Sequence, residues 1–392
     1  MIKFRKIIFL IIINLMSMFI LAGCWDNVDL TKQAFVVGVG LDKTKEGKLE
    51  LTLQIVKPST VASKEGPSTG DKPVWVYSTE GHTIFEAVRK QLETINRKPF
   101  YSHAQIIVIG ESLAKDGIQE SIDFFERDVE PRLTSSVLVA KGTTAKEILK
   151  AKSGLEDIPA MHFKEILQNE KNNLNILNIK LIDILEDLSY PAANPVIASI
   201  DIVKRNKVLS IKDTAVKGCG VFKRDKLVGW LDTEGTKGMK YIKNKSKDGI
   251  INVENPLNNK LKVAIEQLDS ETEIDVNIDN EGLKFTIGVE GKGNIGGQQG
   301  TEDLTSSKQL KSLEEEVQNK IKSQIEHVVN EAQKNFKSDI LGLGLKVSKK
   351  YPYYWDELKK DWSKAFGKAD IKVDVKFNIV RTGLISHPTD IK

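Results

Sequence analysis

The stretch 261–289, LKVAIEQLDSETEIDVNIDNEGLKFTIGV, decides the fold class of the second half of this 392-residue chain. Apolar and polar residues alternate along it in three runs: 261–265, 274–278 and 283–289. A period of two is typical of strands with one buried and one wet face. Turn residues at 269–270 and 280–282 separate the runs. The stretch therefore predicts an antiparallel meander.

A long amphipathic helix follows this meander. It begins at Ser306, and Gln309 three positions later completes a capping pattern. Its apolar residues recur every three or four positions: Leu310, Leu313, Val317, Ile321, Ile325, Val328, Ala332 and Phe336. Such a stripe predicts packing on the adjacent sheet, and a coiled-coil partner is the alternative. The run 371–379 alternates again, so the C-terminal half is predicted as an antiparallel sheet packed by a long helix.

The first half has a different rhythm, in which strands and helices interleave. Its apolar runs are 34–39, 49–56, 74–77, 106–109 and 137–140, and its helical stretches are 84–95, 118–127 and one that begins at Thr144. This alternation predicts a mixed sheet with covering helices. A hairpin is predicted at 215–231, and surface loops are predicted at 59–72 and 244–259. The predicted fold class is α+β with more than one domain.

The N-terminus carries a lipoprotein cleavage box. A basic start and an apolar run at 7–21 lead into Leu21-Ala22-Gly23-Cys24. This is typical of a secretory signal and is short for a permanent membrane span, which needs about 20 apolar residues. The Cys24 thiolate is the nucleophile that would accept a diacylglyceryl group, and two acyl chains give stable anchoring. An uncleaved anchor helix or a lone free cysteine are the alternatives.

Charge and cysteine content narrow the class of protein further. The first 23 residues hold three basic and no acidic side chains, so the rest of the chain carries 55 basic against 54 acidic ones. This balance gives no electrostatic case for nucleic acid. With Cys24 lipidated, only Cys219 remains, and no intramolecular disulfide can form. The N-terminal pattern predicts a signal peptide at 1–23. The remaining length predicts two domains, at 24–200 and 201–392, and the second of these could hold two subdomains.

Motifs for catalysis and cofactor binding are weak. The sequence at 291–296 matches the Gly-x-Gly-x-x-Gly dinucleotide fingerprint, but no helix follows it, and it is interpreted as a flexible loop. The sequence at 38–44 is similar to a phosphate loop, but Asp42 stands where glycine must precede lysine, so it is interpreted as a strand that ends in a turn. The five histidines, His82, His103, His162, His327 and His387, show no metal spacing. We predict no enzyme activity, no cofactor and no metal.

Two polar features remain as candidates. His103 precedes a buried strand, where a structural histidine bonded to a loop is favoured over a ligand-binding one. Asp123 and Arg127 lie one helical turn apart and could form an ion pair that orients the helix against a loop.

Several motifs together carry a resemblance to a known family. They are the box at Cys24-Trp25-Asp26, the segment 103–117, the element Asp123-Phe-Phe-x-Arg127-Asp128, the segment 221–231, and the run from Asp339 through Trp362 and Phe366 to Gly383. In this order they resemble the Ger(x)C family, the C subunits of nutrient germinant receptors of endospore-forming bacteria. The resemblance covers nearly the whole chain after Gly23.

The resemblance implies a lipoprotein on the outer surface of the spore inner membrane. Its partners would be the integral-membrane A and B subunits of the receptor and membrane lipid through Cys24, while contact with the nutrient germinant stays open. The family implies an α/β arrangement in several domains and no catalytic residues, so only Cys24 is carried over as a site, for S-diacylglycerol and N-acyl lipidation. Nutrient-triggered germination, with a docking and assembly role, is the expected function.

Two other classes of protein stay open. A solute-binding lipoprotein of a transporter would have a similar length and anchor, but two lobes with parallel sheets, which the predicted C-terminal meander disfavours. An exported hydrolase would need a nucleophile with a base, or a metal set.

Overall fold

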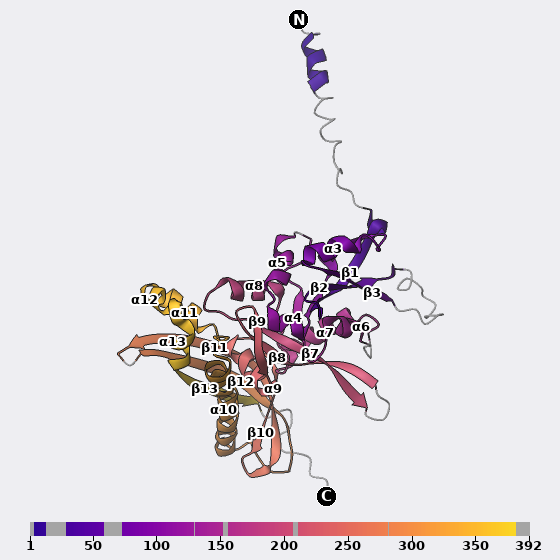
Figure 1. Cartoon of the computed structure of the whole chain (residues 1–392). Helices are drawn as coiled ribbons and strands as arrows, with labels where there is room; N and C mark the ends of the chain where they lie inside the picture. The colour runs from indigo at the N-terminus through magenta and orange to yellow at the C-terminus, as the bar shows by residue number, and fades with distance from the viewer. Residues whose placement is uncertain are drawn as a thin grey trace.

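The computed structural model describes residues 4–12, 29–58, 73–128, 130–151, 156–206, 211–280 and 282–381. Over these residues the chain forms two β-sheets with helices packed on them (Figure 1). The predicted α+β class is confirmed. The loop predicted at 59–72 and the lipidation residue Cys24 lie outside the described residues.

The larger sheet is mixed, as predicted. Its order is β3-β2-β1-β5-β6-β7-β8-β9, and the short β4 pairs with the first residues of β1. The strands are β1 Gln33–Lys43, β2 Leu49–Val56, β3 Val74–Gly81, β4 Lys98–Phe100, β5 Ile106–Ile109, β6 Ser136–Ala140, β7 Val196–Asn206, β8 Ile211–Lys223 and β9 Lys226–Leu231. The four central strands β1, β5, β6 and β7 are parallel, while both flanks pair antiparallel. Strands β8 and β9, which lie beyond residue 200, thus complete this sheet.

Helices cover both faces of the central strands, which explains why these strands read as continuous apolar runs. The helices are α3 Ile84–Gln91, α4 Glu111–Asp116, α5 Gln119–Arg127, α6 Ala145–Lys150, α7 Pro159–Gln168 and α8 Leu181–Ser189. Val108 packs with α6 and α7 on one face, and its neighbour Ile109 packs with α4 and α5 on the other. The predicted helix starts are confirmed, since the hydroxyls of Thr83 and Thr144 accept from the backbone N–H three residues later.

The smaller sheet has the order β10-β11-β12-β13, with β10 Gly249–Asn255, β11 Asn258–Asp279, β12 Gly282–Gln298 and β13 Asp370–Arg381. The first three strands form an antiparallel meander, but its strands are not the predicted ones, because the runs 261–265 and 274–278 both lie in β11 and the run 283–289 lies in β12. The last strand was expected in an antiparallel sheet but pairs parallel to β12, because the chain between them crosses over through helices before it returns. These helices are α10 Ser307–Asn330, α11 Leu343–Lys350, α12 Pro352–Leu358 and α13 Trp362–Lys368.

Two local predictions in this half are wrong. The turn expected at 269–270 is a β-bulge after Gln267, and β11 runs through it without a break. The polar residues there are buried and bonded, because Gln267 and Ser270 both donate to the Ser246 carbonyl. The loop expected at 244–259 contains β10, whose alternate residues, among them Ile251 and Val253, are buried.

The interpretation of 291–296 as a flexible loop is also wrong. These residues lie within β12, which pairs with β11 on one side and β13 on the other. A Cβ on Gly293 would lie 2.6 Å from the Glu266 carbonyl oxygen and 2.8 Å from Cζ of Phe377, and one on Gly291 would lie 2.7 Å from Cδ2 of the same ring. Gly291 and Gly293 therefore make room for the buried ring of Phe377. This packing explains these glycines of the Gly-x-Gly-x-x-Gly pattern without a bound nucleotide.

We expect Gly293→Ala to lower the free energy of unfolding by about 1–3 kcal/mol, because the added methyl group must displace backbone or a packed ring. Urea denaturation measures this change. Gly297→Ala on the same strand is the matched control, since a Cβ there meets nothing within 4 Å. Equal stability of the two variants would contradict this account of the glycines.

Helix α10 covers the smaller sheet as the apolar stripe predicts. Leu313, Val317, Ile321 and Ile325 are fully buried within the same chain, so the intramolecular alternative is confirmed over the coiled coil. The helix also contacts α9 (Thr233–Ile242) closely, and a Cβ on Gly238 would lie 2.2 Å from the Gln324 carbonyl oxygen.

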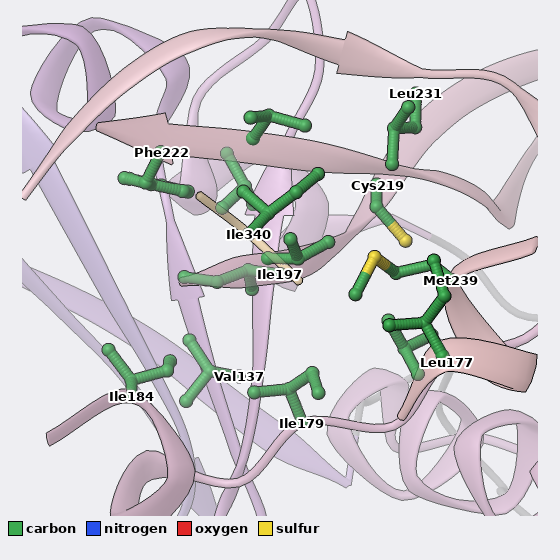
Figure 2. Close-up of a cluster of buried hydrophobic side chains, with 14 of the residues drawn as sticks. Val137, Leu177, Ile179, Ile184, Ile197, Cys219, Phe222, Leu231, Met239 and Ile340 are labelled. Atoms are coloured by element: carbon green, nitrogen blue, oxygen red, sulfur yellow. The ribbon is translucent and has the colours of Figure 1, made fainter. Parts of the chain in front are cut away.

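One apolar core joins the two sheets. Figure 2 shows Ile197 and Phe222 of the larger sheet around Ile340, which belongs to the segment between α10 and α11. In the same view, Met239 of α9 lies beside Cys219 of β8. Both sheets therefore rest on shared side chains. Among the helices of the described residues, none combines the length and the apolar character needed to span a bilayer.

Candidate functional site

A surface groove of ≈ 1040 Å³ lies between α3, α5 and the β8–β9 hairpin. It is lined by Thr83, Ile84, Phe85, Gln119, Glu120, Asp123, Phe124, Arg127, Asp128 and Asp225. The structure thus brings the predicted Asp123 and Arg127 together with a hairpin residue about a hundred positions later in the chain. We take this groove as the candidate functional site.

The groove is predominantly acidic, with a single paired cation in its lining. Arg127 Nε donates to Asp123 Oδ2 at 2.6 Å, which confirms the predicted ion pair. This hydrogen bond lowers the pKa of Asp123 and raises the pKa of Arg127. The other carboxylates are Glu120, Asp128 and Asp225. These carboxylates lie beside the exposed ring of Phe85.

The hairpin wall of the groove is held by one backbone hydrogen bond and one to a side chain. The Ile118 N–H donates to the Asp225 carbonyl at 3.0 Å, and the Arg224 N–H donates to Asn194 Oδ1 at 2.6 Å. Gly117 has φ 140° and lies so near Asp225 that a Cβ would be 2.6 Å from its carboxylate. The wall therefore depends on glycine at this position.

We expect Arg127→Ala to move the midpoint of thermal unfolding by less than about 3 °C, because the ion pair is exposed to solvent. Scanning calorimetry measures this shift. A larger shift would mean that the pair supports the fold and does not serve mainly to shape the groove surface. Lys359→Ala, which breaks another exposed ion pair on α12, is the matched control.

His103 does not reach the groove. Its ring is exposed and packs against the rings of Phe35 and Phe100, with centroids 5.4 and 5.3 Å away. The structural interpretation therefore fits the contacts, with ring packing in place of the expected hydrogen bond to a loop.

The interpretation of 38–44 as a strand that ends in a turn is confirmed, because these residues form the end of β1. Asp42 is buried and accepts from the N–H groups of Ala145 and Lys146 at 2.8 and 2.9 Å. Burial raises its pKa, and its role is to cap α6. Gly40 lets Leu149 of that helix approach the strand closely.

A buried aspartate joins the two halves of the molecule, and sequence reasoning did not assign it this role. Asp339 accepts from the backbone N–H groups of Leu341, Leu343 and Gly344 at 3.1, 3.2 and 2.8 Å, and from Trp362 Nε1 at 3.0 Å. Burial raises the pKa of this carboxyl to about 6, against the opposing effect of these hydrogen bonds. The signal in the sequence is an acidic residue inside the apolar and glycine-rich run 339–344.

The segment around Asp339 touches the larger sheet directly. Asn194 Nδ2 donates to the Asp339 carbonyl at 3.3 Å, and Ser338 Oγ donates to the Phe222 carbonyl at 2.7 Å. A Cβ on Gly344 would lie 2.3 Å from Cβ of Ala192. Since Asn194 also holds the hairpin, the joint between the halves and the wall of the groove share one side chain.

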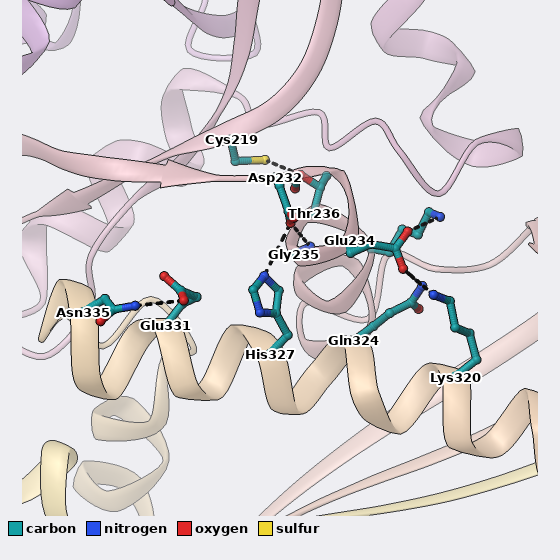
Figure 3. Close-up of polar contacts among 11 residues, drawn as sticks. Cys219, Asp232, Glu234, Gly235, Thr236, Lys320, Gln324, His327, Glu331 and Asn335 are labelled. Carbon is teal, nitrogen blue, oxygen red and sulfur yellow. Dashed lines mark hydrogen bonds and ion pairs between the residues drawn. The ribbon is translucent and has the colours of Figure 1, made fainter.

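A second polar cluster lies between α9 and α10 (Figure 3). Glu234 accepts from Lys237, Lys320 and Gln324 at 2.7, 2.7 and 3.0 Å. Burial alone would raise its pKa, but these three hydrogen bonds outweigh it and lower the pKa to about 2. The cluster therefore ties α10 to α9 through charge.

Cys219 lies beside this cluster, fully buried and 3.5 Å from the Thr236 hydroxyl. Burial raises the pKa of its thiol to about 12, so it is a packing residue and not a nucleophile. Across the part of the chain that the structure describes, no three His, Cys, Asp or Glu side chains group as a metal site.

Comparison with known proteins places these features in a family. The model described as spore germination protein N-terminal domain matches residues 26–202, and the one described as spore germination B3/GerAC like, C-terminal, matches residues 217–383. This chain belongs to the Ger(x)C family of spore germination proteins. The predicted resemblance is confirmed.

Among curated Ger(x)C proteins, Spore germination protein KC of Bacillus subtilis (strain 168) is 30% identical over 396 residues, and the match covers 97% of each chain. Spore germination protein B3 of the same organism is 28% identical, with 93% of this chain and 95% of that protein covered. The crystal structure of the GerBC protein has a similar fold, with a TM-score of 0.55 and 21% identity over 91% of this chain and 100% of that one.

Proposed function

We propose that this chain is the lipid-anchored C subunit of a nutrient germinant receptor, required for nutrient-triggered spore germination. The observation that carries the proposal is that both family domains match this chain, in order. In agreement with this, the chain covers 97% of the length of Spore germination protein KC. The lipoprotein box at Cys24 supports the anchor. A spore germination role follows from the family.

In this proposal the protein body docks and assembles the receptor and performs no chemistry. Its partners are the integral-membrane A and B subunits, on the outer surface of the spore inner membrane. The lipid confines the body to that surface, which raises its effective concentration near the partners, so modest contacts suffice. The acidic groove offers one such contact surface, since Asn194 bonds its hairpin wall to the segment that joins the two halves.

Affinity purification of the tagged full chain from detergent-solubilised spore membranes tests this proposal. We expect two integral-membrane proteins to co-purify in stable proportion, and an unrelated tagged lipoprotein to retain neither. Co-purification with a transport ATPase would favour the alternative, a solute-binding lipoprotein. Recovery of the chain without any membrane protein would contradict the docking role.

A further inference from the structure

The short link between Cys24 and the folded body limits how the body can lie on a membrane. Only five residue steps separate Cys24 from Asp29, the first residue of the described body. An extended chain spans at most about 3.6 Å per residue, so Asp29 lies within about 18 Å of the lipid headgroup that the anchor occupies. This inference rests on the lipid anchor proposed above.

The body end that this link brings to the bilayer is one end of the larger sheet. Figure 1 shows the 3-10 turn Leu30–Lys32 and the start of β1 at the end of the body where the chain enters. Because β1, β2 and β3 pair antiparallel, the start of β1 lies with the end of β2 and the start of β3. Arg97 precedes β4, which pairs with Gln33 at the same end.

This end carries a small hollow with polar and apolar lining, and exposed hydrophobic side chains lie beside it. A hollow of ≈ 260 Å³ is lined by Ala34, Ile55, Val56, Lys57, Pro58, Trp75, Ile95, Asn96 and Arg97. Trp75 is 37% exposed and Leu30, four residues before Ala34, is 66% exposed. The Trp75 ring packs on Tyr77 with centroids 5.0 Å apart, so its position is fixed. An indole with one apolar face and one polar N–H suits the interfacial layer of a bilayer.

The charge of this end complements an anionic surface. The two basic side chains of this end that face solvent beside the hollow are Lys32 and Arg97. Lys98 and Glu130 form an ion pair with each other. Basic groups next to a membrane are attracted to anionic lipid headgroups.

We propose that the patch formed by Leu30, Lys32, Trp75 and Arg97 binds the headgroup layer of an anionic bilayer. The contact is a second attachment point beside the lipid, and it fixes the orientation of the body. With this end down, the rest of the body, including α12, stays away from the bilayer and is free for protein partners.

Fluorescence quenching on the full lipidated chain in vesicles tests the patch. The environment-sensitive label is placed in Leu30→Cys and, separately, in Trp75→Cys, because Cys219 is buried and does not compete for label. Tyr353→Cys is the matched control, since this side chain is 90% exposed on α12. One set of vesicles contains phosphatidylglycerol and a lipid that carries a quencher near the headgroup. A second set contains the same quencher lipid, with phosphatidylcholine in place of phosphatidylglycerol.

We expect quenching at residues 30 and 75 to exceed that at 353 by at least about threefold in phosphatidylglycerol vesicles. Lys32→Glu combined with Arg97→Glu should reduce it to the phosphatidylcholine level. Flotation with the vesicles reports the anchor separately. A chain that floats but is quenched equally at all three positions would overturn the patch alone, and a chain that fails to float would overturn the anchor and the patch together. Quenching that requires the membrane subunits would also overturn it, in favour of a protein docking surface.

Discussion

Spores whose receptor gene carries Cys24→Ala are expected to respond to their nutrient at least about tenfold more slowly than wild-type spores. The substitution removes the thiol that accepts the lipid, and confinement to a surface contributes about 10²–10⁴ in effective affinity when individual contacts are weak. The described core residues begin at Ala34, ten positions after Cys24, so the fold is expected to persist. Release of dipicolinic acid from purified spores measures the response.

The control for this prediction is Cys219→Ala, which removes the only other thiol but leaves the lipoprotein box intact. Immunoblots of spore membranes must show normal amounts of the protein in both strains. A full response of the Cys24→Ala spores at that level would show that the anchor is dispensable.

Asp339→Ala is expected to lower the free energy of unfolding by about 3–5 kcal/mol. The change removes one buried acceptor and leaves four donors, three backbone N–H groups and the Trp362 indole, without it. These donors close the turn between α10 and α11 that ties the smaller sheet to the larger one. Urea denaturation measures the loss, and Asp356→Ala, at an exposed aspartate on α12, should change little. Equal effects of the two substitutions would contradict the claim that the Asp339 carboxylate stabilises the turn that joins the two sheets.

The same carboxyl predicts a dependence of stability on pH. In the folded protein its pKa is raised from 3.8 to about 6, so between these values the folded state binds the proton more tightly than the unfolded state. The stability of wild type relative to Asp339→Asn should therefore fall as pH rises from about 4 to about 6, and stay level above that. Urea denaturation of both proteins at pH 4.5, 5.5 and 7.5 measures the difference. A rise over this range would show that the hydrogen bonds outweigh burial.

Periodicity predicted the regular elements of this fold well, and it failed where side chains from distant segments decide the local structure. The helix capped by Ser306 and the pairing of 274–278 with 283–289 follow directly from capping and alternation. The bulge in β11 could not be predicted, because the buried pair Gln267 and Ser270 is satisfied by Ser246 and Tyr241, which reach it through tertiary folding. Likewise the glycines of 291–296 look like a loop until Phe377 is seen to occupy the space above them.

The candidate site was predictable only in part. The spacing of Asp123 and Arg127 gives their ion pair, since residues four apart meet on a helix. Asp225 joins them through the packing of a hairpin on α5, for which a single sequence carries no signal. The role of Asp339 was hidden for the same reason, because its partner Trp362 lies 23 residues further along.

Deletion of the gene, followed by dipicolinic acid release from purified spores given single nutrients, tests the central claim most directly. The proposal that this chain is a germinant receptor subunit predicts loss of the response to at least one nutrient and its restoration by the wild-type gene. Unchanged release in response to every nutrient, in spores that also lack the other receptor genes of the family, would contradict it.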